Sequence, residues 1–441
     1  MNLPESDEPV RGEDDGEGEE RALLMAVQTF LLKLQAEDGA RLSGENGNLL
    51  RRATAGLGWL RSRMDQEPGI NPASTDRMLE QDHRDRARLM AHVAGRGLEG
   101  RDMGPEPQPK PDVQRPAPTP DDIAAAIYAR TGEKVGIEAI TPIWTETSKE
   151  IFTIICEPAP GWPRNAILRR EPPIAVVATS LVDEYDVLHL THAAGLPVPR
   201  ALFAEADPDI LGGRVLMLEK VEGKTRTLDE IGDDGPAIVA DMAAFLARLH
   251  ALDPDRVPRF RNGPRSIASQ LAQNIAQARA ACDEGDRSGL LTAAFDWLDA
   301  NFAECATEDP AIVHGDFDLR NILIADGRLS SVLDWELSIR GNPAQDLGYC
   351  WPHVTQIGDW DMFMAAYVAA GGRRISQRQI MFFAIWAQIW RIAVIVPLWR
   401  AFYRGDHPVL LLGSLRYLEQ QVYLCDLDRA LRLARSLDPL S

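Results

Sequence analysis

The chain has 441 residues, enough for two or three domains with a sizeable core. Its formal net charge of −19 argues against nucleic acid or an anionic membrane as the main partner. Five cysteines with no Cys-x-x-Cys pair predict reduced thiols rather than a disulfide framework or a zinc site. The acidic start of the chain holds no apolar stretch typical of a secretory signal, and we therefore expect a cytoplasmic protein.

The first 118 residues divide into three segments by composition. Residues 1–20 hold nine acidic side chains and one arginine, which predicts a disordered acidic tail. In residues 21–100 apolar side chains recur at helical spacing, which predicts a helical N-terminal domain. Residues 101–118 are rich in proline and form the predicted linker. The helical region holds no clustered catalytic residue types, and our hypothesis for it is homo-oligomer formation or binding of a partner protein.

A second domain is predicted from residue 119 onward. Thr119 is a candidate helix N-cap, and Pro120 and two acidic residues after it suit the first helical turn. Strands are then predicted over residues 137–144, 150–156, 165–170 and 201–203, and along the apolar residues that follow Arg214. Helices are predicted over residues 237–252, 267–282, 290–302 and 408–437.

Residues 381–399 are apolar enough to suggest a membrane span. Gln388, Arg391 and Pro397 interrupt the run, and we interpret it as a buried core helix and expect no membrane partner. Its tryptophans are candidates for lining a substrate pocket, although packing alone explains any one of them.

The strongest functional signal is the segment His-Gly-Asp-Phe-Asp-Leu-Arg-Asn at residues 314–321, followed by Asp334. Phosphoryl transfer from ATP needs a carboxylate that accepts or orients the proton of the attacking hydroxyl, and oxygen ligands for magnesium. Asp316 suits the first role, and the side-chain oxygens of Asn321 and Asp334 suit the second.

The predicted strands around this segment bring the three side chains together. Residues 311–313 and 322–324 form short strands on either side of the loop. Asp326-Gly327 predicts a hairpin turn into a strand over residues 329–333, which ends at Asp334. A polar turn and a strand-end cap would explain the His-Gly-Asp tripeptide alone, but the full set favours catalysis.

The segment resembles the catalytic loop of the aminoglycoside phosphotransferase and choline kinase-like family, whose fold is similar to that of protein kinases. Gly315 stands where protein kinases of the His-Arg-Asp type carry arginine, which indicates a small-molecule kinase. Leu-Arg-Arg-x-Pro-Pro at residues 168–173 and Leu-Asp-Trp-Glu-Leu at residues 333–337 look most like the kinase-like domains associated with acyl-CoA dehydrogenases.

The resemblance implies an α+β, bilobal kinase-like fold that follows the helical N-terminal region and uses ATP and Mg²⁺. Residues 119–221 would form the small sheet lobe, and residues 222–441 the mostly helical lobe. Strand alternation allows only one of Arg169 and Arg170 into the cleft. By its place in the family pattern, Arg169 would contact the ATP phosphates and pair with Glu184, while replacing Arg170 would have a mild effect.

Five further residues have roles that the resemblance implies. Ser148 lies in the turn over the phosphates and would donate a hydrogen bond, although this turn lacks the glycines common in the family. The backbone near Glu219 and Val221 would form the hinge that binds adenine. His314 would brace the catalytic loop, and Asp346 would anchor its backbone amides.

These features predict a phosphotransferase that transfers phosphate from ATP to a hydroxyl group of a small molecule, with a hydroxyacyl-CoA as one candidate acceptor. One alternative is a cationic acceptor such as an aminoglycoside or choline, which suits the acidic composition. Another is a nucleotide-binding regulator without catalysis, which the missing glycines allow. The presence of Asp316 beside the two metal ligands speaks against a pure binder.

Overall fold

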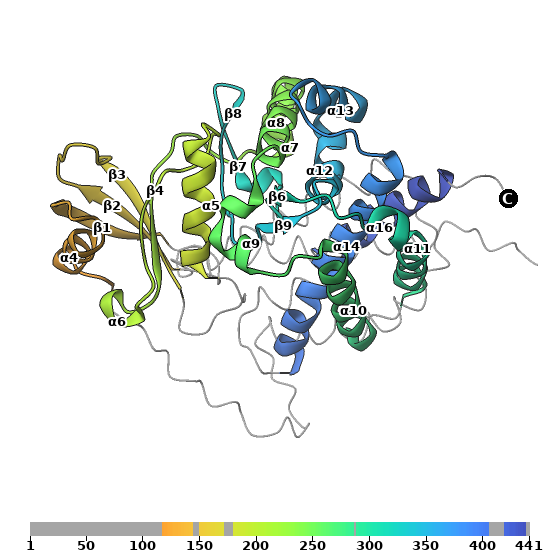
Figure 1. Ribbon diagram of the computed structural model, residues 1–441, viewed down its shortest axis with the longest axis horizontal. Helices are drawn as coiled ribbons and strands as arrows, with labels where there is room; N and C mark the ends of the chain where they lie inside the picture. The colour runs from red at the N-terminus through yellow and green to blue at the C-terminus, as the bar shows by residue number, and fades with distance from the viewer. Residues whose placement is uncertain (1–116, 144–149, 172–179, 286–287, 405–418, 438–441) are drawn as a thin grey trace, which may run out of the picture. The chain divides into compact units, whose positions relative to one another are not determined.

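The computed structural model describes residues 117–143, 150–171, 180–285, 288–404 and 419–437 (Figure 1). The predicted acidic tail, the helical N-terminal domain, most of the linker and Ser148 lie outside the described residues. The chain divides into two compact units, and the larger one comprises residues 108–287, 291–394 and 426–441. The sheet and the catalytic loop described below belong to this larger unit.

The small lobe is a five-stranded antiparallel sheet with the strand order β1-β2-β3-β5-β4. The strands are β1 (Ile137–Ile143), β2 (Glu150–Cys156), β3 (Asn165–Arg170), β4 (Ala201–Glu205) and β5 (Val215–Glu219). Three helices belong to the same part of the chain, namely α4 (Pro120–Thr131), α5 (Leu181–Ala193) and α6 (Pro208–Leu211). In Figure 1, α4 and α5 lie on opposite sides of this sheet.

Helix α4 begins and ends as its sequence predicts. Thr119 and Asp122 form a reciprocal capping box, in which the Thr119 hydroxyl accepts from the Asp122 amide at 3.2 Å and the Asp122 carboxylate accepts from the Thr119 amide at 3.1 Å. Gly132 ends the helix with φ +74°, a conformation that glycine adopts without strain. The helix packs its buried face, including Ile123 and Ile127, into the core of the sheet.

The second part of the larger unit is mostly helical. Its helices, including those that extend beyond this unit, are α7 (Leu228–Ile231), α8 (Gly235–His250), α9 (Pro258–Asn262), α10 (Ile267–Gly285), α11 (Gly289–Cys305), α12 (Ala344–Ile357), α13 (Trp360–Ala369), α14 (Gln377–Arg404) and α16 (Gln420–Ser436), with short 3₁₀ turns η1 (Gly232–Asp234), η2 (Pro254–Arg256) and η3 (Leu319–Asn321). Helix α8 packs against α12 and α13, and the three lie side by side in Figure 1. It also contacts β6 and β8 and so supports the strands that carry the catalytic loop.

Two short antiparallel pairs hold the catalytic loop. Strand β6 (Ala311–Val313) pairs with β9 (Ile339–Gly341), and β7 (Ile322–Ala325) pairs with β8 (Arg328–Val332). Asp326 and Gly327 connect β7 to β8 with φ values of +49° and +71°, as the predicted hairpin turn requires. The sequence placed the end of the last strand one residue too late, because β8 ends at Val332.

Other boundaries differ modestly from the sequence predictions. The strand predicted after Arg214 is β5, which lies between β3 and β4 in the sheet, and α11 is longer than residues 290–302. In the described part of the predicted helix over residues 408–437, α16 begins at Gln420. The short elements α6, α7, α9 and β9 and the helix α13 were not predicted, since short segments have little periodicity.

Helix α14 contains the apolar run that sequence analysis assigned to the core. Among the described residues it alone is long and apolar enough to cross a membrane by composition, over Gln377–Arg400. In its apolar 18-residue window, 83% of the residues are buried inside the structure, as expected of a core helix.

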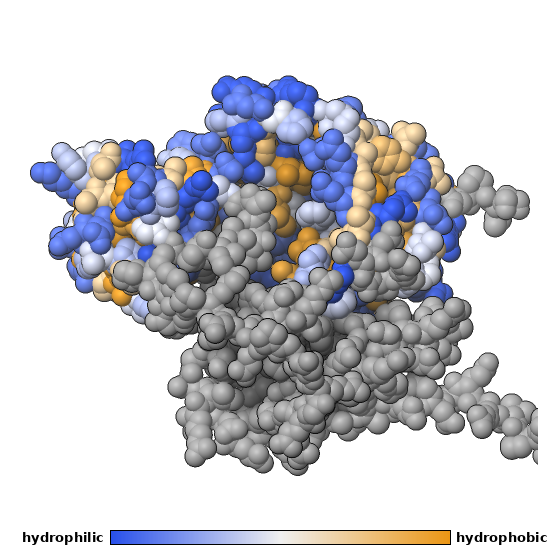
Figure 2. Space-filling view, turned by 90° about the horizontal axis from the view of Figure 1, so that it is seen from below, coloured by the Kyte–Doolittle hydropathy of each residue, from blue (hydrophilic) through white to orange (hydrophobic). Residues whose placement is uncertain are grey.

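Apolar side chains on the described surface occur mainly as scattered single residues. The large exposed ones are Tyr128, Ile143, Ile210, Ile339, Met362, Val394 and Leu433. Figure 2 shows hydrophobic residues interspersed with hydrophilic ones on the face seen from below. Isolated exposed apolar residues of this kind are ordinary in folded proteins.

Candidate active site

Buried aromatic residues fix the two segments that carry the predicted site carboxylates, Asp316 and Asp334. Phe317 and Trp335 follow Asp316 and Asp334 directly in the chain, and both are fully buried. Phe245 of α8 lies between them, with ring centroids 5.5 Å from Phe317 and 6.3 Å from Trp335. Burial of each such side chain contributes about 1.5–3 kcal/mol. Core packing therefore determines where the neighbouring carboxylates point.

The catalytic loop brings Asp316 and Asn321 into direct contact. The Asn321 side-chain amide donates to Asp316 Oδ2 at 2.8 Å and to the Asp316 carbonyl at 3.0 Å. This arrangement leaves the carboxamide oxygen of Asn321 as an oxygen donor for a metal. The Asn321 carbonyl accepts from the amide of Leu333 at 2.8 Å, which joins the loop to the segment of Asp334.

Gly315 is required by the geometry of this loop. Its φ is +83°, in the left-handed region that favours glycine. A Cβ atom at this position would lie 2.3 Å from the carbonyl oxygen of Leu337. The glycine in the His-Gly-Asp motif thus allows the loop to pass close to the segment that follows Asp334.

Asp346 and His314 hold the loop in place, as the sequence predicts. The buried Asp346 carboxylate of α12 accepts from the amides of His314 at 2.8 Å and Gly315 at 2.9 Å. It also lies 3.0 Å from His250 Nε2. His314 accepts from the Asp316 amide through Nδ1 at 3.2 Å and reaches the Leu333 carbonyl through Nε2 at 3.0 Å. Both residues therefore support the backbone of the loop that carries Asp316.

Arg169 of β3 connects α5 with the segment that carries Asp334. Its guanidinium lies 2.6 Å from Glu184 Oε2 and 3.1 Å from Asp334 Oδ1. Burial by itself lowers the pKa of Arg169, but the charges of Glu184, Asp334 and Glu336 outweigh burial and raise it. The ion pair between Arg169 and Glu184 is the contact that we expected, whereas the role of Arg169 toward phosphates stays a prediction.

Glu336 is a potential metal ligand that sequence reasoning missed. Ligand oxygens of Glu184, Asp334 and Glu336 all lie within 4.8 Å of one another. Asp334 has φ +64° and directs the chain so that the carboxylates on either side of Trp335 share this region. Carboxylate oxygens are the donors that Mg²⁺ prefers. The Asp-Trp-Glu spacing was the available signal for Glu336.

Arg170 faces the other side of the sheet and belongs to the core. It is 1% exposed, donates to Glu150 at 2.6 Å and to the Leu211 carbonyl at 3.1 Å, and lies over the ring of Phe152. Strand alternation separates it from Arg169 as predicted. The expectation that its replacement has a mild effect on ATP binding and transfer stays a prediction, although removing this buried guanidinium should lower the stability of the sheet lobe.

The predicted hinge leads directly from the sheet to the catalytic hairpin. The Glu219 amide donates to the Arg200 carbonyl at 2.9 Å, and the Lys220 amide donates to the Asn165 carbonyl at 3.1 Å. Val221 follows, and Lys224 then pairs with Ile324 of β7 through two backbone hydrogen bonds. The adenine-binding role of Glu219 and Val221 remains a prediction.

A sequence profile decides the family. The profile of the phosphotransferase enzyme family matches residues 160–403, more than half of the chain. The chain belongs to this family. The matched span includes β3, the predicted hinge, the catalytic loop and most of α14. Members of the family are phosphotransferases.

The individual relatives agree with this family and with the resemblance noted in the sequence. The chain is 30% identical over 207 residues to acyl-CoA dehydrogenase family member 11 of Rattus norvegicus, covering 43% of this chain and 26% of the relative. It is 28% identical over 145 residues to an aminoglycoside 3′-phosphotransferase of Salmonella typhimurium, covering 31% of this chain and 51% of the relative. The chain thus spans about a quarter of the acyl-CoA dehydrogenase relative.

A solved structure shows the same fold. A candidate aminoglycoside phosphotransferase from Ralstonia eutropha superposes with a TM-score of 0.58 at 18% sequence identity, covering 72% of this chain and 99% of that chain. The fold is therefore the α+β, bilobal kinase-like fold that the sequence predicts, with a small sheet lobe and a mostly helical lobe.

Further charged residues of the present chain lie in or beside the catalytic loop. Sequence analysis did not assign them to the site. Asp318 is buried and lies 3.1 Å from Arg320, 3.0 Å from His353 and 3.3 Å from Arg391. Burial by itself raises the pKa of Asp318, but these cationic neighbours outweigh burial and hold the pKa well below its usual range. Arg391 had a signal in the sequence, as an arginine within an apolar helix.

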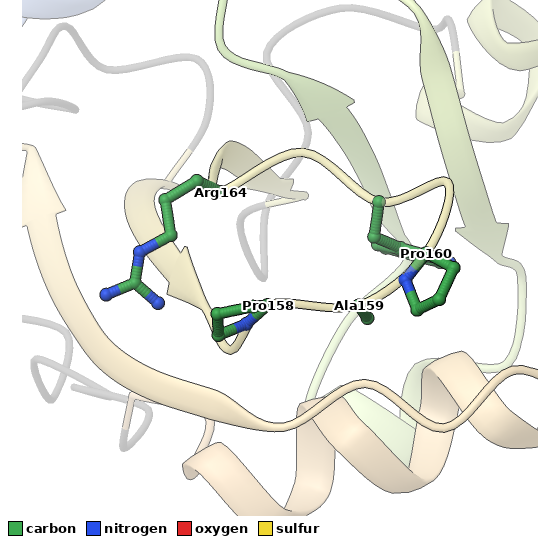
Figure 3. Close-up of a pocket in the computed structure, with 5 residues that line it drawn as sticks. Pro158, Ala159, Pro160 and Arg164 are labelled. Atoms are coloured by element: carbon green, nitrogen blue, oxygen red, sulfur yellow. The ribbon is translucent and has the colours of Figure 1, made fainter.

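A separate hollow lies in the loop between β2 and β3. Its lining residues are Pro158, Ala159, Pro160, Trp162 and Arg164. Figure 3 shows Pro160 and Arg164 on opposite sides of it. Because β2 begins at Glu150, next in the chain to the predicted phosphate turn, and ends at this loop, the hollow lies at the opposite end of β2 from that predicted turn. It holds none of the predicted site residues.

Proposed function

We propose that this protein is an ATP-dependent phosphotransferase that phosphorylates a hydroxyl group of a small molecule. One observation carries the proposal. Asp316 and Asn321 contact each other in the catalytic loop, while Arg169 joins Glu184 to Asp334 in the adjoining segment. These residues are a base, metal ligands and a phosphate-binding cation, which are the groups that phosphoryl transfer requires.

In the proposed reaction, Asp316 takes up the proton of the acceptor hydroxyl as its oxygen attacks the γ-phosphorus. The new oxygen–phosphorus bond forms while the bond to the β-phosphate oxygen breaks and ADP leaves. Asp334, Asn321 and Glu336 would hold Mg²⁺, whose charge neutralises the phosphates. Arg169 contributes further positive charge in a preorganised position.

For the acceptor, we infer a hydroxyacyl-CoA, an anionic molecule. Support comes first from the acyl-CoA dehydrogenase relatives that the chain matches. Local charge adds a second argument, since the side chain of Arg320, four residues after Asp316, is 60% exposed. An exposed cation beside the catalytic loop attracts an anionic acceptor. The acidic composition of the whole chain does not determine the charge beside the catalytic loop.

An aminoglycoside acceptor is the second candidate, and the match to an aminoglycoside 3′-phosphotransferase favours it. The two are distinguished by incubating the purified protein with MgATP and a panel of hydroxyacyl-CoA esters, an aminoglycoside and choline. Mass spectrometry then detects any product that has gained a phosphate, with Asp316→Asn as the inactive control. A phosphorylated CoA ester supports the proposal, and a phosphorylated aminoglycoside or choline contradicts the choice of acceptor. Nucleotide binding without any turnover would favour the regulator hypothesis.

A further inference from the structure

The carboxylate of Asp316 is held from two sides. Asn321 donates to Oδ2 at 2.8 Å, and the hydroxyl of Tyr349 donates to Oδ1. Each carboxylate oxygen has two lone pairs, so these two hydrogen bonds leave one acceptor position on each oxygen. The carboxylate plane is thereby fixed while its capacity to accept a proton is retained.

Helix α12 presents Tyr349 to the catalytic loop together with Asp346. The two residues are three positions apart, which places them on the same face of the helix. Asp346 binds the backbone amides at His314 and Gly315, and Tyr349 reaches the side chain of Asp316. One helix therefore sets both the path of the loop and the orientation of its carboxylate.

The ring of Tyr349 is fixed in turn by Arg391 of α14. The Arg391 guanidinium lies 3.7 Å from the centroid of the ring, a favourable cation–π distance. Arg391 is 6% exposed and also contacts the buried Asp318 at 3.3 Å. Tyr349 and Arg391 therefore contact each other, and each of them also contacts the catalytic loop, Tyr349 through Asp316 and Arg391 through Asp318.

The hydroxyl of Tyr349 stays protonated and therefore remains a donor. Burial raises the pKa of Tyr349 well above its usual value, and Asp316 and Asp318 add to this effect although Arg391 opposes it. A phenylalanine at this position would keep the packing and the contact with Arg391 but lose the hydrogen bond to Asp316.

We propose that Tyr349 is a positioning residue of this phosphotransferase, whose hydroxyl orients the carboxylate of Asp316 toward the acceptor while Arg391 holds its ring. The proposal rests on the proposed function. It assigns to Tyr349 an effect on the rate of transfer and none on nucleotide binding. A misplaced catalytic group costs up to about 100-fold in rate, and we expect Tyr349→Phe to lose at least ~10-fold.

The test measures MgATP turnover, with water as the acceptor, for the wild type, Tyr349→Phe, Asp316→Ala and the double variant. Tyr349→Phe should lower kcat and leave the KM for ATP unchanged. The double variant should be no slower than Asp316→Ala, because Tyr349 acts only through Asp316. Tyr423→Phe is the matched control, since this residue is 9% exposed and its hydroxyl donates to Glu419 at 2.7 Å.

Thermal unfolding of the same four proteins, without nucleotide or metal, tests the contact independently of turnover. The two single variants should lower Tm by amounts that are not additive in the double variant. Normal kcat in Tyr349→Phe, a raised KM with unchanged kcat, or additive losses of rate or of Tm would overturn the inference. If the wild type transfers phosphate neither to water nor to any acceptor of the panel above, the proposed function fails, and the unfolding cycle still decides whether Tyr349 holds Asp316.

Discussion

Replacing Arg169 with alanine removes one guanidinium from two carboxylates at once. Glu184 is 1% exposed and 2.6 Å away, and Asp334 is 35% exposed and 3.1 Å away. Breaking a buried ion pair costs about 3–5 kcal/mol because the remaining charge is buried without its partner. Water screens the exposed Asp334, and we therefore expect the lower end, a loss of about 3 kcal/mol in the free energy of unfolding.

The same change should impair catalysis if Arg169 contacts the phosphates. Loss of one preorganised electrostatic group typically lowers kcat by ~10²–10³. Urea unfolding followed by tryptophan fluorescence measures the stability, and MgATP turnover below the unfolding transition measures the rate. Arg169→Lys should recover part of the stability but little of the rate, since lysine lacks the planar fork that spans two oxygens.

Arg170→Ala separates the two roles of these neighbouring arginines. Arg170 is buried in the core of the sheet lobe and contacts Glu150 and the Leu211 carbonyl. Its removal should therefore lower stability, while the turnover of the protein that remains folded stays close to normal. The reasoning would be refuted if Arg169→Ala changed the unfolding free energy by less than about 1 kcal/mol with normal turnover. It would equally be refuted if Arg170→Ala were the variant that lost turnover while folded.

Four further substitutions test the metal site, the loop and the buried carboxylate. Asp334→Ala should abolish the enhancement of nucleotide binding by Mg²⁺, and Glu336→Ala should weaken it. Nucleotide titrations with and without Mg²⁺ measure this enhancement. Equal enhancement in the wild type and both variants would exclude both residues as metal ligands. Gly315→Ala should destabilise the fold by roughly 1–3 kcal/mol, because its Cβ would meet the Leu337 carbonyl at positive φ, and an unchanged Tm would contradict this. The pKa of Asp318 is lowered in the folded state, so its stabilising contribution is fully present above its unfolded pKa and is lost as pH falls from that value through the lower folded pKa. Unfolding free energy measured from neutral to acidic pH should therefore fall less steeply for Asp318→Asn, and identical slopes would contradict the assignment.

The parts of the site that the sequence predicted are those set by local spacing. Asp316 and Asn321 are five positions apart in one loop, and a two-residue hairpin connects that loop to the segment of Asp334. Side-chain alternation along β3 was enough to predict that Arg169 and Arg170 lie on opposite faces of the sheet. Periodicity and capping residues likewise predicted most strands and long helices.

The parts that the sequence did not predict depend on tertiary packing. Tyr349 meets Asp316 across 33 residues, and Arg391 meets Asp318 across 73, through helices whose placement no local pattern determines. The burial of Arg170 had no signal in the sequence, because burial of an arginine depends on partners elsewhere in the fold. Glu336 had a signal in its spacing from Asp334, but its proximity to Glu184 required the packing of α5 beside the loop.

The most direct test of the account is the transfer of phosphate from ATP by the wild type and by Asp316→Asn. Phosphorus NMR follows ATP consumption and product formation with Mg²⁺ and a hydroxyacyl-CoA, and calorimetry measures nucleotide binding by both proteins. The account predicts a phosphorylated acceptor with the wild type, and a loss of ~10²–10⁴ in rate with Asp316→Asn at nearly unchanged ATP affinity. Transfer at a normal rate by Asp316→Asn would contradict the central claim that this carboxylate is the catalytic base.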